Sequence, residues 1–495
     1  SSDVCSSDLK LVSSLPSERA QSVMAEGGIN AALNTKDEND SPEEHFTDTI
    51  KAACGLADPN AVWGMTQAAP ELVHWLLKLG VKFNMSGYDD VDLRNFGGQK
   101  KKRTAFAQSD TGKQIMTAMI DAVRRKEASG MVERFSHHSF LTLRLCGNIC
   151  CGCVIRDEYS QETVELPGDA VIVATGGMHG LFGNTTGSLS NTGEVTAELF
   201  RLGVPLANGE MIQYHPTTVK CGGKRMLISE AARGEGGRLF AMKDGKQWYF
   251  MEEKYPELGN LMPRDITARE IWKVSHESEV FLDMTEISEE IISNKLSGLA
   301  DDCMTYLHKD IRKEPVSVLP GIHYFMGGIL VDEQHRTPIQ NLYAAGECCA
   351  QYHGANRLGG NSLLGALYGG RVAAKSACEQ ADVVDLSCAT QIDFPPASQI
   401  SEIKQLNKVM QETMGVVRNE NTLLNGIQTV QALTGNLPLL GMAVLKSALA
   451  RKESRGAHWR EDYPKSNDDD YLKTTVARFD GKQIQISFVP VPERR

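Results

Sequence analysis

The sequence lacks a long apolar run and lacks an excess of positive charge. No apolar stretch approaches the roughly 20 residues that a membrane-spanning helix needs. Lys and Arg number 52 against 63 Asp and Glu, which gives a formal net charge of −11. A chain this acidic is poorly suited to binding nucleic acid or an anionic lipid surface. We therefore expect no nucleic-acid partner and no direct insertion into a membrane.

Regularly spaced cysteines are also missing, although the chain has 12 of them. Scattered cysteines in a long chain indicate free thiols in a reducing compartment, so we expect a cytoplasmic protein. The densest group is Cys146, Cys150, Cys151 and Cys153, around a predicted hairpin turn at Gly147-Asn148. Alternating strand residues point to opposite faces, so these thiols converge poorly. We predict no metal site.

A third absence is the G-x-G-x-x-G turn that holds the pyrophosphate of a dinucleotide after a first strand. The chain begins instead with S-S-D-V-C-S-S-D-L, which has no apolar periodicity. We interpret residues 1–9 as a non-native junction that replaces the true N-terminus, so the lack of a signal peptide carries no information. The alternative is a native, disordered tail.

What is present fits an α/β protein of several domains: 495 residues, 41% hydrophobic, with 45 glycines. Residues 170–174 form an apolar run typical of a buried central parallel strand, which ends in Thr175-Gly176-Gly177. A second strand is predicted at 342–347, and Asn191 to Glu194 opens a helix. Further helices are expected within 41–80 and at 265–276, 288–308, 400–414, 421–432 and 442–454, with a solvated turn at 468–470 and a small sheet at 474–489.

The most informative stretch is G-A-N-R-L-G-G-N-S-L, residues 354–363, which follows L-Y-A-A-G-E at 342–347. Its glycines allow close approach of the backbone to a ligand, its Arg suits an anionic group, and Asn-Ser opens a helix. Four more motifs accompany it: Q-Y-H-P-T from residue 213, I-S-E-A-A-R-G-E-G-G-R from 228, M-P-R-D from 262 and G-I-H-Y-F-M-G-G from 321. In this order they resemble the succinate dehydrogenase/fumarate reductase flavoprotein family, from about Lys10 to Val489.

The resemblance implies an α/β fold with a Rossmann-like FAD-binding domain, an inserted α+β capping domain and a C-terminal helical domain. The expected boundaries are 10–215 and 322–392 for the FAD-binding domain, 216–321 for the capping domain, 393–465 for the helical domain and 466–495 for a C-terminal segment. Because the first βα unit is missing from this pattern, we expect weak or absent FAD retention until it is restored.

The resemblance also assigns catalytic roles. Arg264 is the expected active-site acid, and Glu230 with Arg233, three residues apart on one helix face, is the expected proton path. A guanidinium normally keeps its proton, so Arg264 can serve only in a dry site with a relay that reprotonates it. Glu235 could take the role of Glu230. The alternative for the Glu230–Arg233 pair is a surface salt bridge without a catalytic role. Asp265 is expected to orient the loop.

Substrate contacts are implied at five positions: His215, Ser229, His323, Arg357 and Phe96. His215 and His323 would bind substrate carboxylates and Arg357 would clamp one of them, while Phe96 and Gln99 are possible lid contacts. A structural histidine in a turn is the alternative for His215. Phe325 departs slightly from the common H-Y-T-M-G-G of the family.

For FAD, the implied contacts are Ala25, Gly27, Gly28, Ala174, Thr175, Gly176, Glu347, Asn361, Ser362 and Leu363. Covalent members of the family carry R-S-H-T, with its His linked to the flavin, where this chain has Arg19-Ala20-Gln21-Ser22. Because Gln21 cannot form that bond, we predict non-covalent FAD. The resemblance associates the missing bond with fumarate reduction rather than succinate oxidation.

The resulting hypothesis is a fumarate reductase flavoprotein of anaerobic electron transport. It would act on a small dicarboxylate, take electrons from an iron–sulfur subunit or another donor, and lie at a membrane only through a partner. The alternatives are L-aspartate oxidase, which usually reads H-Y-T-C-G-G in place of H-Y-F-M-G-G, a reductase of another unsaturated acid, and a decayed, non-enzymatic scaffold. The joint presence of His215, Glu230, Arg264, His323 and Arg357 argues against decay.

Overall fold

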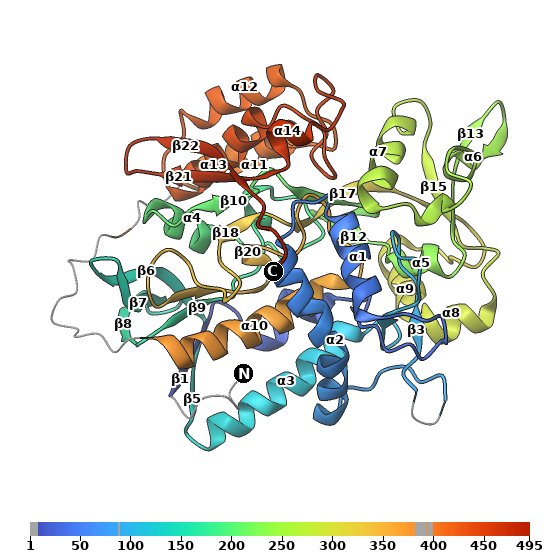
Figure 1. The fold of residues 1–495 in the computed structure, drawn as a ribbon. Helices are drawn as coiled ribbons and strands as arrows, with labels where there is room; N and C mark the ends of the chain where they lie inside the picture. The colour runs from blue at the N-terminus through green and yellow to red at the C-terminus, as the bar shows by residue number, and fades with distance from the viewer. Residues whose placement is uncertain (1–7, 88–89, 382–393, 395–398) are drawn as a thin grey trace.

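The computed structural model describes residues 8–87, 90–381, 394 and 399–495. Most of the predicted N-terminal junction and the proposed boundary at 392 lie outside these residues. Figure 1 shows three regions: a blue, cyan and green body with helix α10, a yellow-green lobe, and an orange-red helical region. The chain leaves the body near residue 213, forms the lobe, and returns near residue 322. Both expectations, an inserted lobe and C-terminal helices, therefore hold.

Short parallel strand pairs form part of the body. β1 (Leu9–Ser13) pairs with β5 (Val132–Ser136), and β9 (Val171–Val173) pairs with β19 (Leu342–Ala344). The prediction that β9 is a buried central strand is wrong for the described chain. There it pairs with β19 alone, and Ile172 is 38% exposed. An apolar run reveals a strand but not the number of its neighbours.

Helices of the body cover these strands and carry clear end signals. α1 (Pro42–Ala52) is capped by Ser41, and α2 (Pro59–Leu79) starts after Asp58 and ends at Gly80 in the left-handed conformation. The other body helices are α3 (Thr111–Ala128), α4 (Glu194–Arg201) and α10 (Asn361–Gln380). Apolar side chains of α2, α3 and α10 share one core cluster with β2 (Ile29–Asn30) and β3 (Leu93–Arg94).

The body contains two further three-stranded sheets. One contains β2, β3 and β4 (Thr104–Ala105), and the other is the hairpin β6 (His138–Cys146) and β7 (Ile149–Asp157), joined by β8 (Thr163–Pro167). The predicted hairpin at Gly147-Asn148 is confirmed, and no group of residues suited to a metal exists in the described chain. Burial raises the pKa of Cys150 to about 12, so its thiol stays protonated. Cys146 is disulfide-bonded, which corrects the expectation that all thiols are free.

The capping region has its own apolar core, built around a four-stranded sheet and short helices. The sheet consists of β13 (Arg238–Lys243), β14 (Lys246–Trp248), β15 (Val280–Asp283) and β16 (Val316–Ser317), while β12 (Lys224–Leu227) pairs with the strand at Ile212–Cys221. Its helices are α5 (Glu230–Gly234), α6 (Phe250–Lys254), α7 (Arg264–Val274), α8 (Glu289–Lys295) and α9 (Ser297–Asp302). The single helix predicted at 288–308 is wrong, because α8 ends at Lys295, α9 starts at Ser297, and a π-helical turn follows α9.

The C-terminal helices α11 (Ile400–Thr413), α12 (Glu420–Val430) and α13 (Asn436–Ala450) pack together as predicted. α13 begins and ends earlier than the predicted 442–454. Its C-terminal end lies at Ala450 because Arg451 leaves the helix to bond with Glu210 and Glu453. Residues 468–470 form α14 (Asp468–Tyr471) rather than a turn. Among the residues described, no helix combines the length and apolarity that crossing a membrane would require.

The predicted terminal sheet is not separate. β21 (Lys473–Phe479) and β22 (Ile484–Pro490) extend a five-stranded sheet of the body in the order β20-β18-β10-β21-β22. Its other strands are β10 (Leu206–Ala207), β18 (Gly328–Leu330) and β20 (Cys349–Ala350). The C-terminal segment thus ties the helical region to the body.

Candidate active site

Two paired strands at the junction of body and capping region hold the first part of the site. β11 (Ile212–Cys221) carries Gln213 and His215, and its antiparallel neighbour β17 (Leu319–Phe325) carries His323. The two imidazole rings meet edge to face, with centroids 5.1 Å apart. His215 contacts Thr217 through Nδ1, and His323 contacts the Thr186 hydroxyl through Nδ1 at 2.8 Å. These contacts fix the ring orientations.

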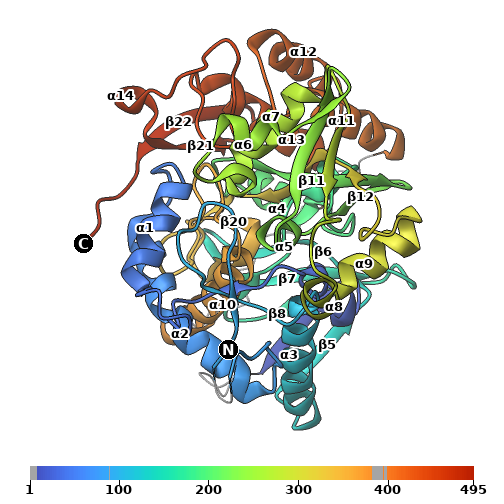
Figure 2. The same cartoon turned by 90° about the vertical axis from the view of Figure 1, so that its right-hand side faces the viewer.

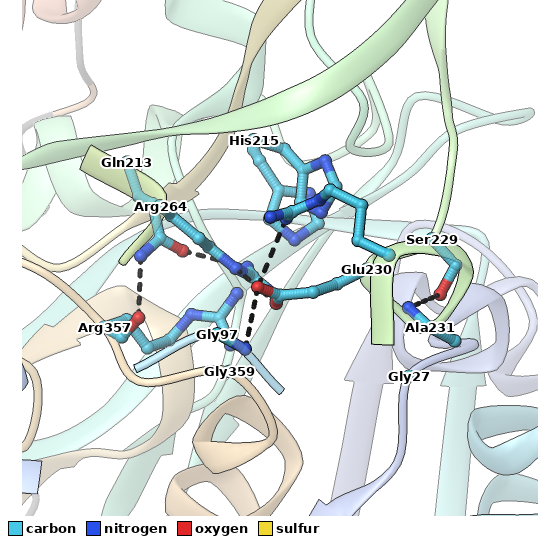
Figure 3. Close-up of polar contacts among 12 residues, drawn as sticks. Gly27, Gly97, Gln213, His215, Ser229, Glu230, Ala231, Arg264, Arg357 and Gly359 are labelled. Carbon is cyan, nitrogen blue, oxygen red and sulfur yellow. Dashed lines mark hydrogen bonds and ion pairs between the residues drawn. The ribbon is translucent and has the colours of Figure 1, made fainter. Parts of the chain in front are cut away.

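A buried chain of charges crosses the middle of the site (Figure 3). Arg264, the first residue of α7, donates from Nε and Nη2 to Glu230 Oε2 at 2.9 and 2.6 Å. Arg233 Nη2 donates to Glu230 Oε1 at 3.2 Å, and the Gly97 amide donates to the same oxygen at 3.2 Å. Glu230 therefore bridges two guanidinium groups, and the predicted pairing with Arg233 is present.

Burial and the two arginines act on Glu230 in opposite directions. Desolvation alone would raise the pKa of the carboxyl, but Arg264 and Arg233 outweigh it and hold the pKa below its usual value. Burial also lowers the pKa of Arg233, although Glu230 opposes this effect. The result is an ionised carboxylate between two cations in a nearly dry environment, since Arg264 is only 6% exposed.

Arg357 brings a third guanidinium to the site, and no carboxylate of the described chain forms an ion pair with it. It is buried, lies over the Tyr324 ring at 4.3 Å, and its Nε has no hydrogen-bond partner among the described residues. Burial and the charge of Arg264 lower the pKa of Arg357 to about 9. A buried cation with unused donors is costly unless an anion completes it.

His215 and His323 are uncharged at neutral pH and therefore do not alter the net charge of the site. Burial and then the positive charge of Arg264 hold the pKa of His215 and of His323 well below the ordinary value. Within the part of the chain that the structure describes, Glu230 is thus flanked by Arg233, Arg264 and Arg357, a local excess of two positive charges. Neutral imidazoles and surplus guanidinium groups suit a ligand with two negative charges.

Ser229 and Phe96 line the same junction in different ways. Ser229 caps α5 by accepting from the Ala231 amide at 3.4 Å. Phe96 is fully buried, and its ring lies about 3.1 Å from the position that a Cβ would take on either Gly27 or Gly359. Gln99 donates to Asn30 and to the Gly359 carbonyl, so it holds this loop and is not an exposed lid residue.

The turns predicted to contact FAD come together around Phe96. Gly28 has φ +130°, and a Cβ there would lie 2.5 Å from the Ala105 carbonyl oxygen. Gly360 has φ +84°, and its Cβ would lie 2.1 Å from Asn30 Oδ1. Both positions therefore require glycine. Two segments far apart in the sequence thus approach each other through glycines, which fits close contact with a planar cofactor, and the segment with Gly360 leads directly into α10.

The Asn361 side chain, predicted as a cofactor contact, bonds to neighbouring protein groups. Its Oδ1 accepts from Asn30 and contacts His45 Nε2, and its Nδ2 donates to Thr49. With the side chain fully buried and bonded to protein, Asn361 positions the loop before α10. Ser362 is partly exposed at the next position and Leu363 is buried.

The remaining predicted cofactor contacts follow the strands β9 and β19 or the short 3-10 helix at Gln21–Met24. Ala174 and Thr175 are exposed and Gly176 half-buried just after β9, while Glu347 follows β19 and accepts from the Phe325 amide at 3.0 Å. Ala25 accepts from the Gly112 amide through its carbonyl. Gln21 lies on a short 3-10 helix, and its Oε1 accepts from the Ser188 amide at 2.5 Å.

Two amide side chains of the site escaped the sequence analysis. Gln213 Oε1 accepts from Arg264 Nη1 at 3.1 Å, while its Nε2 donates to Asn356 Oδ1 and to the Arg357 carbonyl. Gln213 thereby joins the capping helix α7 to the loop of Arg357 (Figure 3). Gln213 lies two residues before His215, and Asn356 lies one residue before Arg357, so both stand inside motifs already quoted. This proximity was the only sign of their role in the sequence.

Comparisons with known proteins agree with this site. Residues 7–363 match the model described as FAD binding domain, and residues 433–494 match that of the fumarate reductase flavoprotein C-terminal region. The chain is 37% identical to the succinate dehydrogenase flavoprotein subunit of Bacillus subtilis (strain 168), with 98% of this chain and 94% of the relative covered. It is 32% identical to an L-aspartate oxidase of Nostoc sp., with 92% and 86% covered.

Among solved structures, a chain of E. coli quinol fumarate reductase superposes with a TM-score of 0.88 at 27% identity, over 97% of this chain and 92% of that one. The described elements thus share its fold from end to end. Together with the family models, this establishes an FAD-dependent oxidoreductase. The chain belongs to the succinate dehydrogenase/fumarate reductase flavoprotein family.

Proposed function

We propose that this protein reduces fumarate to succinate, with Arg264 as the proton donor. The observation that carries the proposal is the Glu230 carboxylate bridging Arg264 and Arg233 inside a buried site. When bound, FAD supplies the hydride that adds to one alkene carbon. The residues of this chain bind the two carboxylates, exclude water and deliver a proton to the other carbon.

Substrate binding follows from the surplus positive charge. Arg357, whose guanidinium donates to no carboxylate among the described residues, is proposed to clamp one substrate carboxylate. His215, His323 and the Ser229 hydroxyl offer neutral hydrogen-bonding groups at the same junction. In a site of low dielectric, such prearranged groups stabilise charge that develops on the substrate as hydride arrives.

Proton delivery needs a relay because a guanidinium holds its proton tightly. The proposed path runs from Arg233 through Glu230 to Arg264, along hydrogen bonds of 3.2 Å and then 2.6 or 2.9 Å. When Arg264 gives a proton to the substrate carbon, the Glu230 carboxylate takes a proton from Arg233 and passes one to Arg264, and Arg233 is then reprotonated from solvent. The Gln213 contact with Arg264 Nη1 keeps the donor oriented. Asp265 accepts backbone N–H groups at the start of α7, which supports the same helix end.

Non-covalent attachment of FAD is part of the proposal, since Gln21 occupies the position of the linking histidine and its amide is bonded to Ser188. Acid precipitation followed by absorbance of the supernatant tests this point. All flavin should appear in the supernatant, whereas yellow colour retained in the washed precipitate would show a covalent bond.

The electron donor is proposed to be an iron–sulfur subunit, with association at a membrane only through partners. Because the resemblance links the absence of the covalent bond to fumarate reduction, the proposed direction is from fumarate to succinate. The competing candidate is L-aspartate oxidase, which the 32% identity to the Nostoc enzyme favours. A reductase of another unsaturated dicarboxylic acid would use the same carboxylate clamps.

The deciding experiment compares substrates on one preparation of the chain, loaded with FAD after a family-like N-terminus has been restored. Oxidation of a reduced viologen dye on addition of fumarate is expected, and it should be faster than with other unsaturated acids. L-aspartate and oxygen should produce no hydrogen peroxide. Peroxide from aspartate without fumarate turnover would assign the chain to aspartate oxidation, and preference for another unsaturated acid would change the substrate.

A further inference from the structure

Tyr324 is a buried aromatic residue of β17 to which the proposed reaction gives no role. The Cζ atom of the Arg357 guanidinium lies 4.3 Å from the centre of its ring. Arg233 and Arg264 are held differently, because both bond to the Glu230 carboxylate. An uncharged ring thus stands beside Arg357 where the other two guanidinium groups have a carboxylate.

The backbone around Arg357 is fixed independently of its side chain. Gln213 Nε2 donates to the Arg357 carbonyl at 2.8 Å, and the Ala355 amide donates to the Ala53 carbonyl at 3.0 Å. Gly354 has φ +51°, and a Cβ there would lie 2.6 Å from the same Ala53 oxygen. The loop therefore has little freedom, and the direction of the long arginine side chain depends on what its guanidinium contacts.

Neighbouring groups hold the Tyr324 ring in place. Tyr324 lies directly opposite Gln213 in the antiparallel pair of β17 and β11, so both side chains project from the same face of the pair. The His353 ring meets the Tyr324 ring edge to face, with centroids 5.3 Å apart. Burial and then the charge of Arg357 hold the pKa of His353 well below its ordinary value, so this neighbour is neutral. Figure 2 shows β11 beside α7, the helix that begins with Arg264.

An aromatic face can hold a guanidinium without neutralising it. A carboxylate partner would cancel the charge of Arg357 and occupy N–H donors that a substrate carboxylate needs. The negative face of a tyrosine ring attracts the cation, yet the ring carries no charge and leaves the in-plane N–H donors free. The Arg357 Nε has no hydrogen-bond partner among the described residues, as expected of a donor that is kept for a ligand.

We propose that Tyr324 is a positioning residue for substrate binding: its ring face directs the Arg357 guanidinium toward a substrate carboxylate and preserves its positive charge. The inference rests on the proposed function, since Arg357 is the proposed clamp. Arg357 is charged at neutral pH, because burial and the charge of Arg264 lower its pKa only to about 9. From the strength of desolvated cation–π contacts, loss of the ring face should weaken dicarboxylate binding roughly 5- to 30-fold.

The first test changes the charge distribution of the ring while its size stays nearly constant. Phenylalanine and its mono-, di- and trifluorinated forms replace Tyr324 in the chain that has a restored family-like N-terminus and bound FAD. Each fluorine withdraws electrons from the ring face and weakens its attraction for a cation. KM for fumarate should stay within about threefold of the parent in Tyr324→Phe and then rise with each fluorine, with a smaller change in kcat. A flat KM across the fluorinated series would overturn the inference.

A double-mutant cycle shows whether Tyr324 acts through Arg357. Tyr324→Leu alone should raise KM roughly 5- to 30-fold, because leucine has no ring face. In the background of Arg357→Gln the same change should raise KM less than about threefold, since the cation that the ring positions is gone. A rise of equal size in both backgrounds would contradict the inference. Melting temperatures show whether each variant folds, and the fluorinated series decides if Tyr324→Leu does not.

Binding of malonate separates the two proposals. Malonate is a dianion with a single methylene group, so it cannot be converted to an alkene, and calorimetry gives its Kd without turnover. If Kd for malonate rises with fluorination but no protein reduces fumarate, the proposed function fails and the inference stands. If the parent reduces fumarate while Kd and KM stay flat across the series, the inference alone fails. A parent that neither binds malonate nor reduces fumarate would overturn both.

Discussion

Arg357 shows how a single buried side chain defines the chemistry that the site can accept. Its guanidinium lies over an aromatic face and pairs with no carboxylate in the part of the chain that the structure describes, so its charge remains available for an anion. The flanking glycines made it noticeable in the sequence, but its isolation from acidic partners is a property of the folded chain. The same holds for Gln213, which stands next to conspicuous residues and acquires its role only when α7 approaches β11.

Replacing Arg357 with Lys should raise KM for fumarate roughly 10- to 100-fold, because an ammonium group cannot reproduce the planar pair of donors. The value of kcat should change less, since the proton path through Glu230 is untouched. Steady-state kinetics with the dye assay measures both. The control is Arg371→Lys, an exposed arginine of α10 that pairs with Glu71. An unchanged KM in Arg357→Lys would exclude it as the carboxylate clamp.

At the scale of elements, helix ends were predictable and neighbour relations were not. Ser41 and Asp58 cap the starts of α1 and α2, and Gly80 caps the end of α2. These caps are predictable because they depend on contacts within a few residues. The breaks between α8 and α9 depend on packing against the capping core, and the exposure of β9 depends on which strands lie beside it. Such long-range relations leave no local pattern in the sequence.

The loop before α10 offers a test of backbone geometry at this scale. Gly360→Ala should destabilise the protein by about 1–3 kcal/mol, because the residue has φ +84° and its Cβ would collide with Asn30. Gly370→Ala, in the middle of α10 with nothing within 4 Å of the added atom, should be neutral or stabilising by up to about 1 kcal/mol. Melting temperatures compare the two. Equal effects would mean that the left-handed loop is not required.

For the molecule as a whole, a buried ionic network connects the C-terminal helical region to the body, although its members are far apart in the sequence. Arg451, at the end of α13, bonds to Glu210 of the body, to Glu453, and to the carbonyls of Tyr471 and Lys473. The α/β class, the inserted lobe and the helical region followed from composition and motif order. The attachment of β21 to the body did not, since it depends on partners far apart along the chain.

Removing Arg451 should therefore loosen the C-terminal region from the body. Arg451→Met is expected to cost about 3–5 kcal/mol, because the buried Glu210 carboxylate would lose its ion-pair partner and buried Glu453 would keep only Arg455. Arg371→Met, which breaks an exposed pair, should cost no more than about 1 kcal/mol. Thermal unfolding followed by circular dichroism compares the variants, and a loss for Arg451→Met as small as for the control would contradict the structural role of the network.

The central claim, that Arg264 protonates the substrate, is tested most directly by fumarate-dependent oxidation of reduced viologen in Arg264→Ala. The account predicts a loss of roughly 10²- to 10⁴-fold in turnover, the usual contribution of a positioned acid, with FAD content unchanged. Lys273→Ala removes an exposed cation from the same helix and should keep normal turnover. Turnover in Arg264→Ala that remains within about threefold of the parent would contradict the assignment of Arg264 as the acid.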